Sequence, residues 1–63
     1  MKYLNNHIRE LTEGKKVTYR SKVYWANMET REIYAHSVEA EISGSISGYK
    51  VAGITEDGQI VKA

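Results

Sequence analysis

The residues best suited to chemistry in this sequence are four cations and a tyrosine that lie close together in the chain. No acidic residue occurs between Gly14 and Met28. If this segment is extended, alternate side chains share one surface. Cations neutralise phosphates, and aromatic rings stack on nucleic-acid bases. The segment therefore offers a candidate nucleic-acid-binding surface formed by Lys15, Lys16, Arg20, Lys22 and Tyr24.

The next segment is acidic and supports a simpler interpretation of these cations. Four glutamates and one arginine occur from Glu29 to Glu41. If the two segments form a hairpin, Arg20 lies opposite Glu39, and such a pair stabilises by roughly 0.2–1 kcal/mol. The cationic face is then an ordinary solvated surface. We favour this interpretation because the net charge is only +1, whereas nucleic-acid-binding domains are usually strongly basic.

Two other groups of side chains have suitable types for a metal site or for nucleophilic catalysis, but unsuitable spacing. His7, Glu10 and His36 match no familiar ligand spacing. His36 and Ser37 are neighbours on an expected strand, so their side chains point to opposite faces and His36 cannot activate the hydroxyl. We therefore predict no catalytic residue, no metal site and no cofactor.

Length and composition predict one small domain, residues 1–63, with a thin hydrophobic core. The sequence contains no Cys, Phe or Pro. A chain this short buries only about 60% of the surface that its unfolded form exposes. A dimer buries more apolar surface per chain, so self-association is favoured. We therefore predict a small non-catalytic accessory or regulatory module that acts through protein–protein contact and forms a homo-oligomer. Nucleic-acid binding is the alternative function.

The same composition indicates where the protein works. No apolar run approaches the roughly 20 residues that a membrane span requires. Residues 1–16 contain no apolar core typical of a signal peptide. The absence of Cys also excludes a disulfide framework. We expect a cytoplasmic protein that does not associate with membranes.

Apolar spacing predicts a short helix over residues 3–13. Leu4, Ile8 and Leu11 lie at positions i, i+4 and i+7, which is one helical stripe. Gly14 follows the last apolar position and suits a left-handed C-terminal cap. The sequence therefore places an amphipathic helix before the cationic segment.

Residues 17–42 are predicted to form a hairpin whose loop is residues 28–31. In this register Trp25 lies opposite Tyr34 and Tyr24 lies opposite Ala35, and the pairing continues to Val17 opposite Ile42. One face then holds the apolar side chains of both strands, and the other holds the cations, Tyr24 and the glutamates. A slip of one residue would destroy this sorting. The spacing of the loop residues is similar to the hairpin turn of WW domains, which implies a turn geometry alone; the residues concerned are Tyr24, Asn27, Thr30 and Glu32.

A second helix at about residues 30–43 is the alternative for this region. Tyr34, Val38 and Ile42 are spaced i, i+4 and i+8, which also fits a helical stripe. Thr30 is a suitable cap for its beginning and Gly44 for its end. The sequence alone leaves both possibilities open.

The C-terminal residues predict a second hairpin, and with it the fold class. Glu56, Asp57 and Gly58 form a three-residue hairpin loop that places Ile54 opposite Ile60. Gly44–Gly48 reads as a loop. We predict an α+β fold, with the N-terminal helix packed on an antiparallel meander of about four strands. The predicted core consists of Leu4, Ile8, Leu11, Val17, Tyr19, Val23, Trp25, Tyr34, Val38, Ile42, Val51, Ile54 and Ile60.

Overall fold

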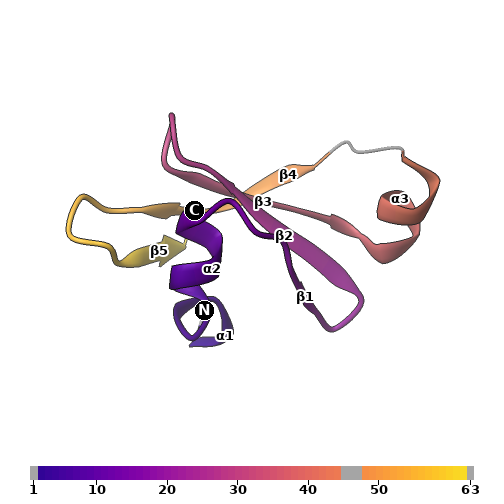
Figure 1. Cartoon of the computed structure of the whole chain (residues 1–63), viewed down its shortest axis with the longest axis horizontal. Helices are drawn as coiled ribbons and strands as arrows, with labels where there is room; N and C mark the ends of the chain where they lie inside the picture. Colours follow the sequence, from indigo (N-terminus) through magenta and orange to yellow (C-terminus); the bar gives the residue numbers. More distant parts are fainter. Residues whose placement is uncertain (1, 45–47, 63) are drawn as a thin grey trace.

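The structure, a computed structural model, describes residues 2–44 and 48–62 and has an α+β fold, as predicted. Five antiparallel strands form one curled sheet in chain order, with the N-terminal helices on one side of it (Figure 1). No helix of the described residues is long and apolar enough to span a bilayer. The elements are α1 (Lys2–Asn5), α2 (Ile8–Thr12), β1 (Val17–Tyr19), β2 (Lys22–Asn27), β3 (Glu32–Ser37), α3 (Val38–Ser43), β4 (Tyr49–Ile54) and β5 (Ile60–Lys62).

The predicted N-terminal helix is present but is interrupted between α1 and α2. Its apolar stripe is kept, since Leu4 and Leu11 are fully buried. Gly14 adopts the predicted left-handed conformation, with φ of 83°. The Lys15 N–H donates to the Glu10 carbonyl and the Gly14 N–H donates to the Leu11 carbonyl, which is the Schellman pattern of helix termination.

The register predicted for the central hairpin is confirmed for β2 and β3. Trp25 pairs with Tyr34, Tyr24 with Ala35, and Asn27 with Glu32. The Asn27 side chain accepts a hydrogen bond from the Glu29 N–H at 3.0 Å, and this bond helps to shape the predicted loop at residues 28–31. Short polar side chains favour such turns because they can bond to nearby backbone groups.

The confirmed register comprises six pairs, from Lys22 with Ser37 to Asn27 with Glu32. Beyond them the predicted hairpin is wrong on its N-terminal side. Arg20 and Ser21 have φ of 49° and 63°, and they form a tight turn that folds β1 back onto β2. Tyr19 pairs with Lys22 and Val17 with Tyr24. The expected pairs of Arg20 with Glu39 and Val17 with Ile42 therefore do not form.

On its C-terminal side the predicted hairpin is wrong because β3 gives way to α3. The Ser37 hydroxyl oxygen accepts a hydrogen bond from the Ala40 N–H at 3.0 Å, so Ser37 is the N-cap of the new helix. Gly44 ends the helix in a left-handed conformation. The alternative of a second helix is thus correct for residues 38–43 and wrong for residues 30–37. The predicted loop at residues 44–48 lies largely outside the described residues.

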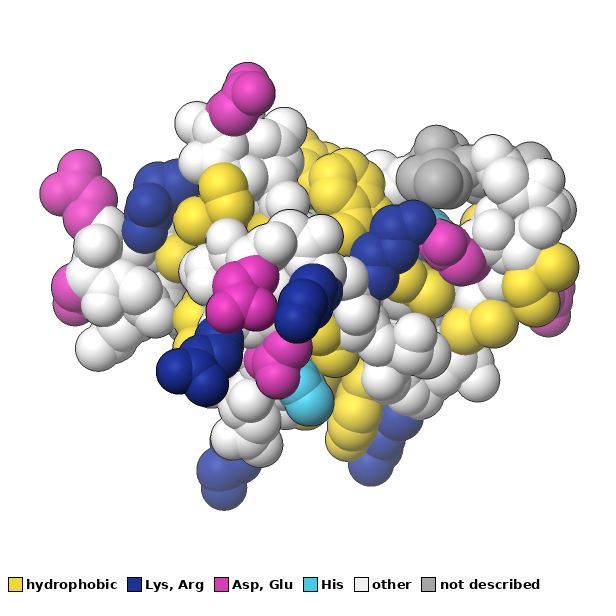
Figure 2. Space-filling model, in the orientation of Figure 1, with side chains coloured by type: hydrophobic (Ala, Val, Ile, Leu, Met, Phe, Trp, Pro, Cys, Tyr) yellow, Lys and Arg dark blue, Asp and Glu magenta, His cyan; other side chains and the backbone are white. Residues whose placement is uncertain are grey.

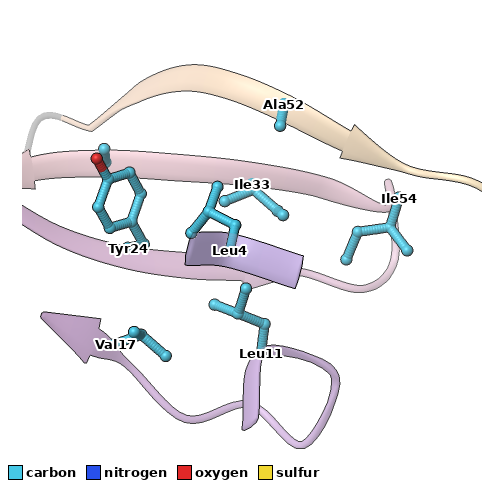
Figure 3. Packing of buried hydrophobic residues seen from close by; sticks show 8 residues of the cluster. Leu4, Leu11, Val17, Tyr24, Ile33, Ala52 and Ile54 are labelled. Atoms are coloured by element: carbon cyan, nitrogen blue, oxygen red, sulfur yellow. The ribbon is translucent and has the colours of Figure 1, made fainter. Parts of the chain in front are cut away.

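The main buried cluster lies on the opposite face of the hairpin from the one predicted, although Val23 on the predicted face is also buried. Tyr24, expected among the polar residues, is only 5% exposed, whereas Ile42, expected in the core, is 82% exposed. Trp25 and Tyr34 lie on the other face, where they are partly exposed. The side chains between the sheet and the N-terminal helices converge (Figure 3), and the buried cluster consists of Leu4, Leu11, Val17, Tyr24, Ile33, Ala35, Ala52 and Ile54.

The C-terminal hairpin is confirmed. Ile54 pairs with Ile60, the Thr55 N–H donates to the Gln59 carbonyl at 2.8 Å, and Gly58 has φ of 85°. A register shift beside Ile33 and Tyr34 marks an irregularity in the pairing of β3 with β4. The sheet ends at β5 as predicted, and it has one strand more than predicted because the turn at Arg20 divides the first predicted strand into β1 and β2.

Candidate functional site

An open depression of about 470 Å³ lies where the β1–β2 hairpin meets α1. We call it the tyrosine–cation depression. Apolar and basic side chains lie beside each other near the tip of this hairpin, at the lower edge of Figure 2. The residues that line it come from α1, β1, the turn and β2, and they are Tyr3, Tyr19, Arg20, Lys22 and Tyr24.

Three tyrosine rings pack against one another in this depression. Tyr3 and Tyr19 are stacked, with ring centroids 4.2 Å apart and planes 8° apart. Tyr3 also contacts Tyr24 in a tilted arrangement, and their hydroxyl oxygens are hydrogen-bonded at 3.0 Å. Burial, followed by the hydrogen bond to Tyr3, raises the pKa of Tyr24 above its ordinary value. The Tyr24 hydroxyl therefore stays neutral and anchors Tyr3 over the sheet.

The two cations of the depression rest on aromatic rings. The Arg20 guanidinium carbon lies 5.3 Å from the centroid of Tyr19, and the Lys22 ammonium nitrogen lies 5.6 Å from the centroid of Tyr49. A hydrogen bond with Tyr49 raises the pKa of Lys22, so Lys22 is cationic at neutral pH. Neither cation is ion-paired with a carboxylate of the described residues. Both charges are thus available to an anionic ligand.

Of the five residues proposed from the sequence, the structure brings three together and separates two. Arg20, Lys22 and Tyr24 line one depression. Lys22 and Tyr24 alternate on β2 as expected, whereas Arg20 reaches the depression from the β1–β2 turn. Lys15 instead lies 3.5 Å from a Glu13 carboxylate oxygen, and Lys16 lies 2.9 Å from Glu41. These two lysines do not line the depression.

Tyr3 and Tyr19 line the depression, and Tyr49 lies beside it, without a signal in the sequence that they share this surface. One continuous strand over residues 17–27 would place Tyr19 in the core. The tight turn at Arg20 brings Tyr19 beside Lys22 instead. Tyr3 directly precedes Leu4, the first residue of the apolar stripe. This position beside the stripe indicates that Tyr3 flanks the buried face of the helix.

A second surface lies on the face of the sheet opposite the N-terminal helices, and we call it the open face. Trp25 and Tyr34 are stacked there with centroids 4.9 Å apart. The Lys50 ammonium lies 3.0 Å from a Glu32 carboxylate oxygen at its margin, and Val61 is 54% exposed. The open face consists of Trp25, Glu32, Tyr34, Lys50 and Val61, which the strand pairings place on one side of the sheet.

His36 joins the open face to α3. It is 3% exposed, and its Nδ1 accepts a hydrogen bond from the Trp25 indole N–H at 3.2 Å. Its Nε2 lies 2.6 Å from Glu41, whose other carboxylate oxygen contacts Lys16. Because the indole can only donate, the proton of a neutral His36 lies on Nε2 and is donated to Glu41. Both ring nitrogens are engaged, and these contacts secure α3.

The remaining candidates from the sequence have structural partners. The His7 Nδ1 lies 3.9 Å from Glu10 at the N-terminal helices, apart from His36. The described residues contain no group of three potential metal-ligating side chains. Ser37 uses its hydroxyl to cap α3.

Comparison with known proteins gives no relative from which a function can be transferred. No family model, no curated protein and no solved structure matches this chain.

Proposed function

We propose that this protein is a small non-catalytic module that acts through protein–protein contact and associates with a second copy of itself through the open face. The stacked pair of Trp25 and Tyr34 carries this proposal, since it is partly exposed on the face that the N-terminal helices do not cover. Tryptophan and tyrosine are enriched in the energetically important parts of protein interfaces.

The margin of the open face supports a second copy as the partner. Glu32 and Lys50 place both signs of charge beside the stacked rings. In a two-fold contact the same patch meets itself, so the Glu32–Lys50 pair of one chain would meet the same pair of the other and could exchange partners with it. A surface of a single charge sign would repel its own copy, whereas this margin carries both signs.

The small size of the core supports the same proposal. Only nine hydrophobic residues of the described chain are buried, and two of them are alanines. Covering Trp25 and Tyr34 would add aromatic area to what each chain buries, at about 25 cal/mol per Å² of apolar surface. We also propose that the protein works in the cytoplasm, because a small extracellular domain usually requires disulfides and this sequence has no Cys.

Light scattering coupled to size-exclusion chromatography tests the association over a range of protein concentrations. The parent should elute with a mass above the 7.2 kDa of one chain. Val61→Lys should return it to that mass, because a cation then enters the apolar part of the contact while the exposed site leaves folding intact. Ile42→Ser removes an exposed apolar side chain of α3 and should leave the mass unchanged. A parent that stays at 7.2 kDa at every concentration would refute the proposal.

A further inference from the structure

We infer that the tyrosine–cation depression binds single-stranded nucleic acid. A single strand exposes flat bases that alternate with phosphates, and proteins bind it by stacking aromatic rings on the bases and placing cations along the backbone. The depression offers both kinds of group over a small area, with Arg20 at Tyr19 and Lys22 at Tyr49. This inference does not depend on the self-association proposed for the open face.

The charges of the depression favour an anionic ligand. All five lining residues are tyrosines or cations, and none is a carboxylate. The glutamate expected to face Arg20, Glu39, belongs to α3 and not to a strand beside β1, so the predicted pair that would neutralise Arg20 does not form. Lys15, Lys16 and Lys50, by contrast, each have a carboxylate partner within 3.5 Å.

The rings of the depression favour a single strand over a duplex or an acidic peptide. In a duplex the base faces are stacked inside the helix, so only base edges in the grooves can be reached. An acidic peptide would use the two cations but would leave the exposed ring beside them without a flat partner. That ring belongs to Tyr49, which lies next to Lys22 at the margin of the depression and not in its lining. Tyr49 is 50% exposed, so a base can stack on it when the Lys22 ammonium moves to a phosphate.

The backbone of the β1–β2 turn provides an independent argument. Both Arg20 and Ser21 adopt positive φ, the conformation for which such two-residue turns normally use Asn or Gly. Three other left-handed positions of the described chain, 14, 44 and 58, are glycines. Non-glycine residues held in this conformation are strained, and such strain gathers at functional sites.

A second arginine of the described chain also has positive φ, and its side chain holds a neighbouring strand in place. Arg31, with φ of 58°, donates side-chain hydrogen bonds to the carbonyls of Ile54 and Thr55, which fix β4. Arg20 makes no comparable bond among the described residues, and its guanidinium lies over Tyr19 at the edge of the depression. A ligand that uses the charge of Arg20 would account for an arginine at this strained position.

The size of the depression limits the ligand to a short stretch of strand. Its volume of about 470 Å³ falls in the range of about 300–1,000 Å³ typical of small-molecule sites. With two cations, we expect about two phosphates to be neutralised. The logarithm of the binding constant should then fall with the logarithm of salt concentration at a slope of about −1.4, since each phosphate of a single strand contributes about −0.7.

Fluorescence anisotropy with a short labelled oligothymidine at low salt tests the inference. The parent should bind it with micromolar affinity and should bind a duplex of the same length less tightly. Arg20→Gly should weaken binding about tenfold, as expected for the loss of a charged hydrogen bond, and halve the salt slope. Its melting temperature should be no lower than that of the parent, because glycine relieves the strain of the turn.

Three matched variants separate the ligand site from general effects. Ser21→Gly relieves the same turn without removing a cation, and Lys15→Gln removes an equal charge outside the depression, so both should bind like the parent. Val61→Lys should also bind normally, which separates this site from self-association. The inference is refuted if Arg20→Gly binds like the parent, if no oligothymidine complex forms, or if the duplex or a glutamate-rich peptide binds more tightly.

Discussion

The two faces of the β2–β3 hairpin share one register but are stabilised by different means. The covered face holds Ile33 and Ala35 fully buried beneath the N-terminal helices. The open face holds Trp25 and Tyr34, which stack on each other and remain partly exposed. The stacked pair of Trp25 and Tyr34 therefore does not mark the core. Apart from Tyr24, the buried side chains of the cluster are small or aliphatic, and such side chains allow helices to pack closely on a sheet.

The sharpest test of this difference uses adjacent residues on opposite faces. Ile33→Ala should cost about 2–5 kcal/mol, as is usual for a truncated buried aliphatic side chain. Small proteins have only about 0.05–0.15 kcal/mol of stability per residue, so this variant should lose a large part of the stability of the parent. Tyr34→Ala should cost about 1–2 kcal/mol, because its ring is only partly removed from water.

Urea denaturation followed by circular dichroism measures both variants against the parent. The order of the two costs is the decisive result, since alanine removes more atoms from Tyr34 than from Ile33. If Tyr34→Ala proved the more destabilising change, the open face would contain the principal core of the protein.

The alternation of residues in β2 and β3 was enough to predict the register but not the buried face. Period two shows which side chains share a face, and all six pairs from Lys22 to Asn27 follow it. It does not show which face the helices cover. The cations and Tyr24 make the other face look polar and so favour the face of Trp25 and Tyr34 as the core, whereas the helices lie against the face that contains Ala35.

The turn at Arg20 and Ser21 could not be predicted because its residues carry no turn signal. Gly, Asn and Asp favour left-handed conformations, and this turn contains none of them. Its consequences reach the candidate site: Arg20, Lys22 and Tyr24 share a surface as predicted, while Tyr19 joins them only because β1 folds back. By contrast, Gly58 gave the C-terminal hairpin a clear signal, and that hairpin was predicted correctly.

A second test removes one hydrogen bond from the open face while keeping its stack. Trp25→Phe preserves an aromatic ring opposite Tyr34 but removes the indole donor of His36, which is buried. An acceptor left unpaired in a buried site costs about 1–3 kcal/mol. Thermal unfolding of this variant should therefore begin at a clearly lower temperature than that of the parent.

Tyr34→Phe is the matched control for that variant. It removes a hydroxyl that donates to Glu32 near the surface, so its cost should be about 0.5 kcal/mol or less. Equal costs for the two variants would show that His36 does not depend on the indole donor.

Glu41 and Tyr24 should respond to opposite extremes of pH. Hydrogen bonds from Lys16 and then from His36 hold the pKa of Glu41 below its ordinary value on the open-face side. Ionised Glu41 therefore stabilises the fold above its unfolded-state pKa, and this contribution is lost as pH falls through the lower folded-state pKa. On the covered face the pKa of Tyr24 is raised. Its contribution is present below the unfolded-state pKa and is lost as pH rises through the folded-state pKa.

The smallest expected effect is the change in the pH dependence of stability when Glu41 or Tyr24 is replaced. Melting temperatures measured across the pH range should fall at the acid end for the parent, and Glu41→Gln should flatten that fall while leaving the alkaline end unchanged. Tyr24→Phe should flatten the fall at the alkaline end and leave the acid end unchanged, because it removes the hydroxyl that titrates on the covered face and keeps the ring.

The effect of Glu41 should be modest, since its side chain is 33% exposed and exposed ion pairs contribute little. If Glu41→Gln left the acid limb as steep as in the parent, the contact between Glu41 and His36 would not be what secures α3 to the open face.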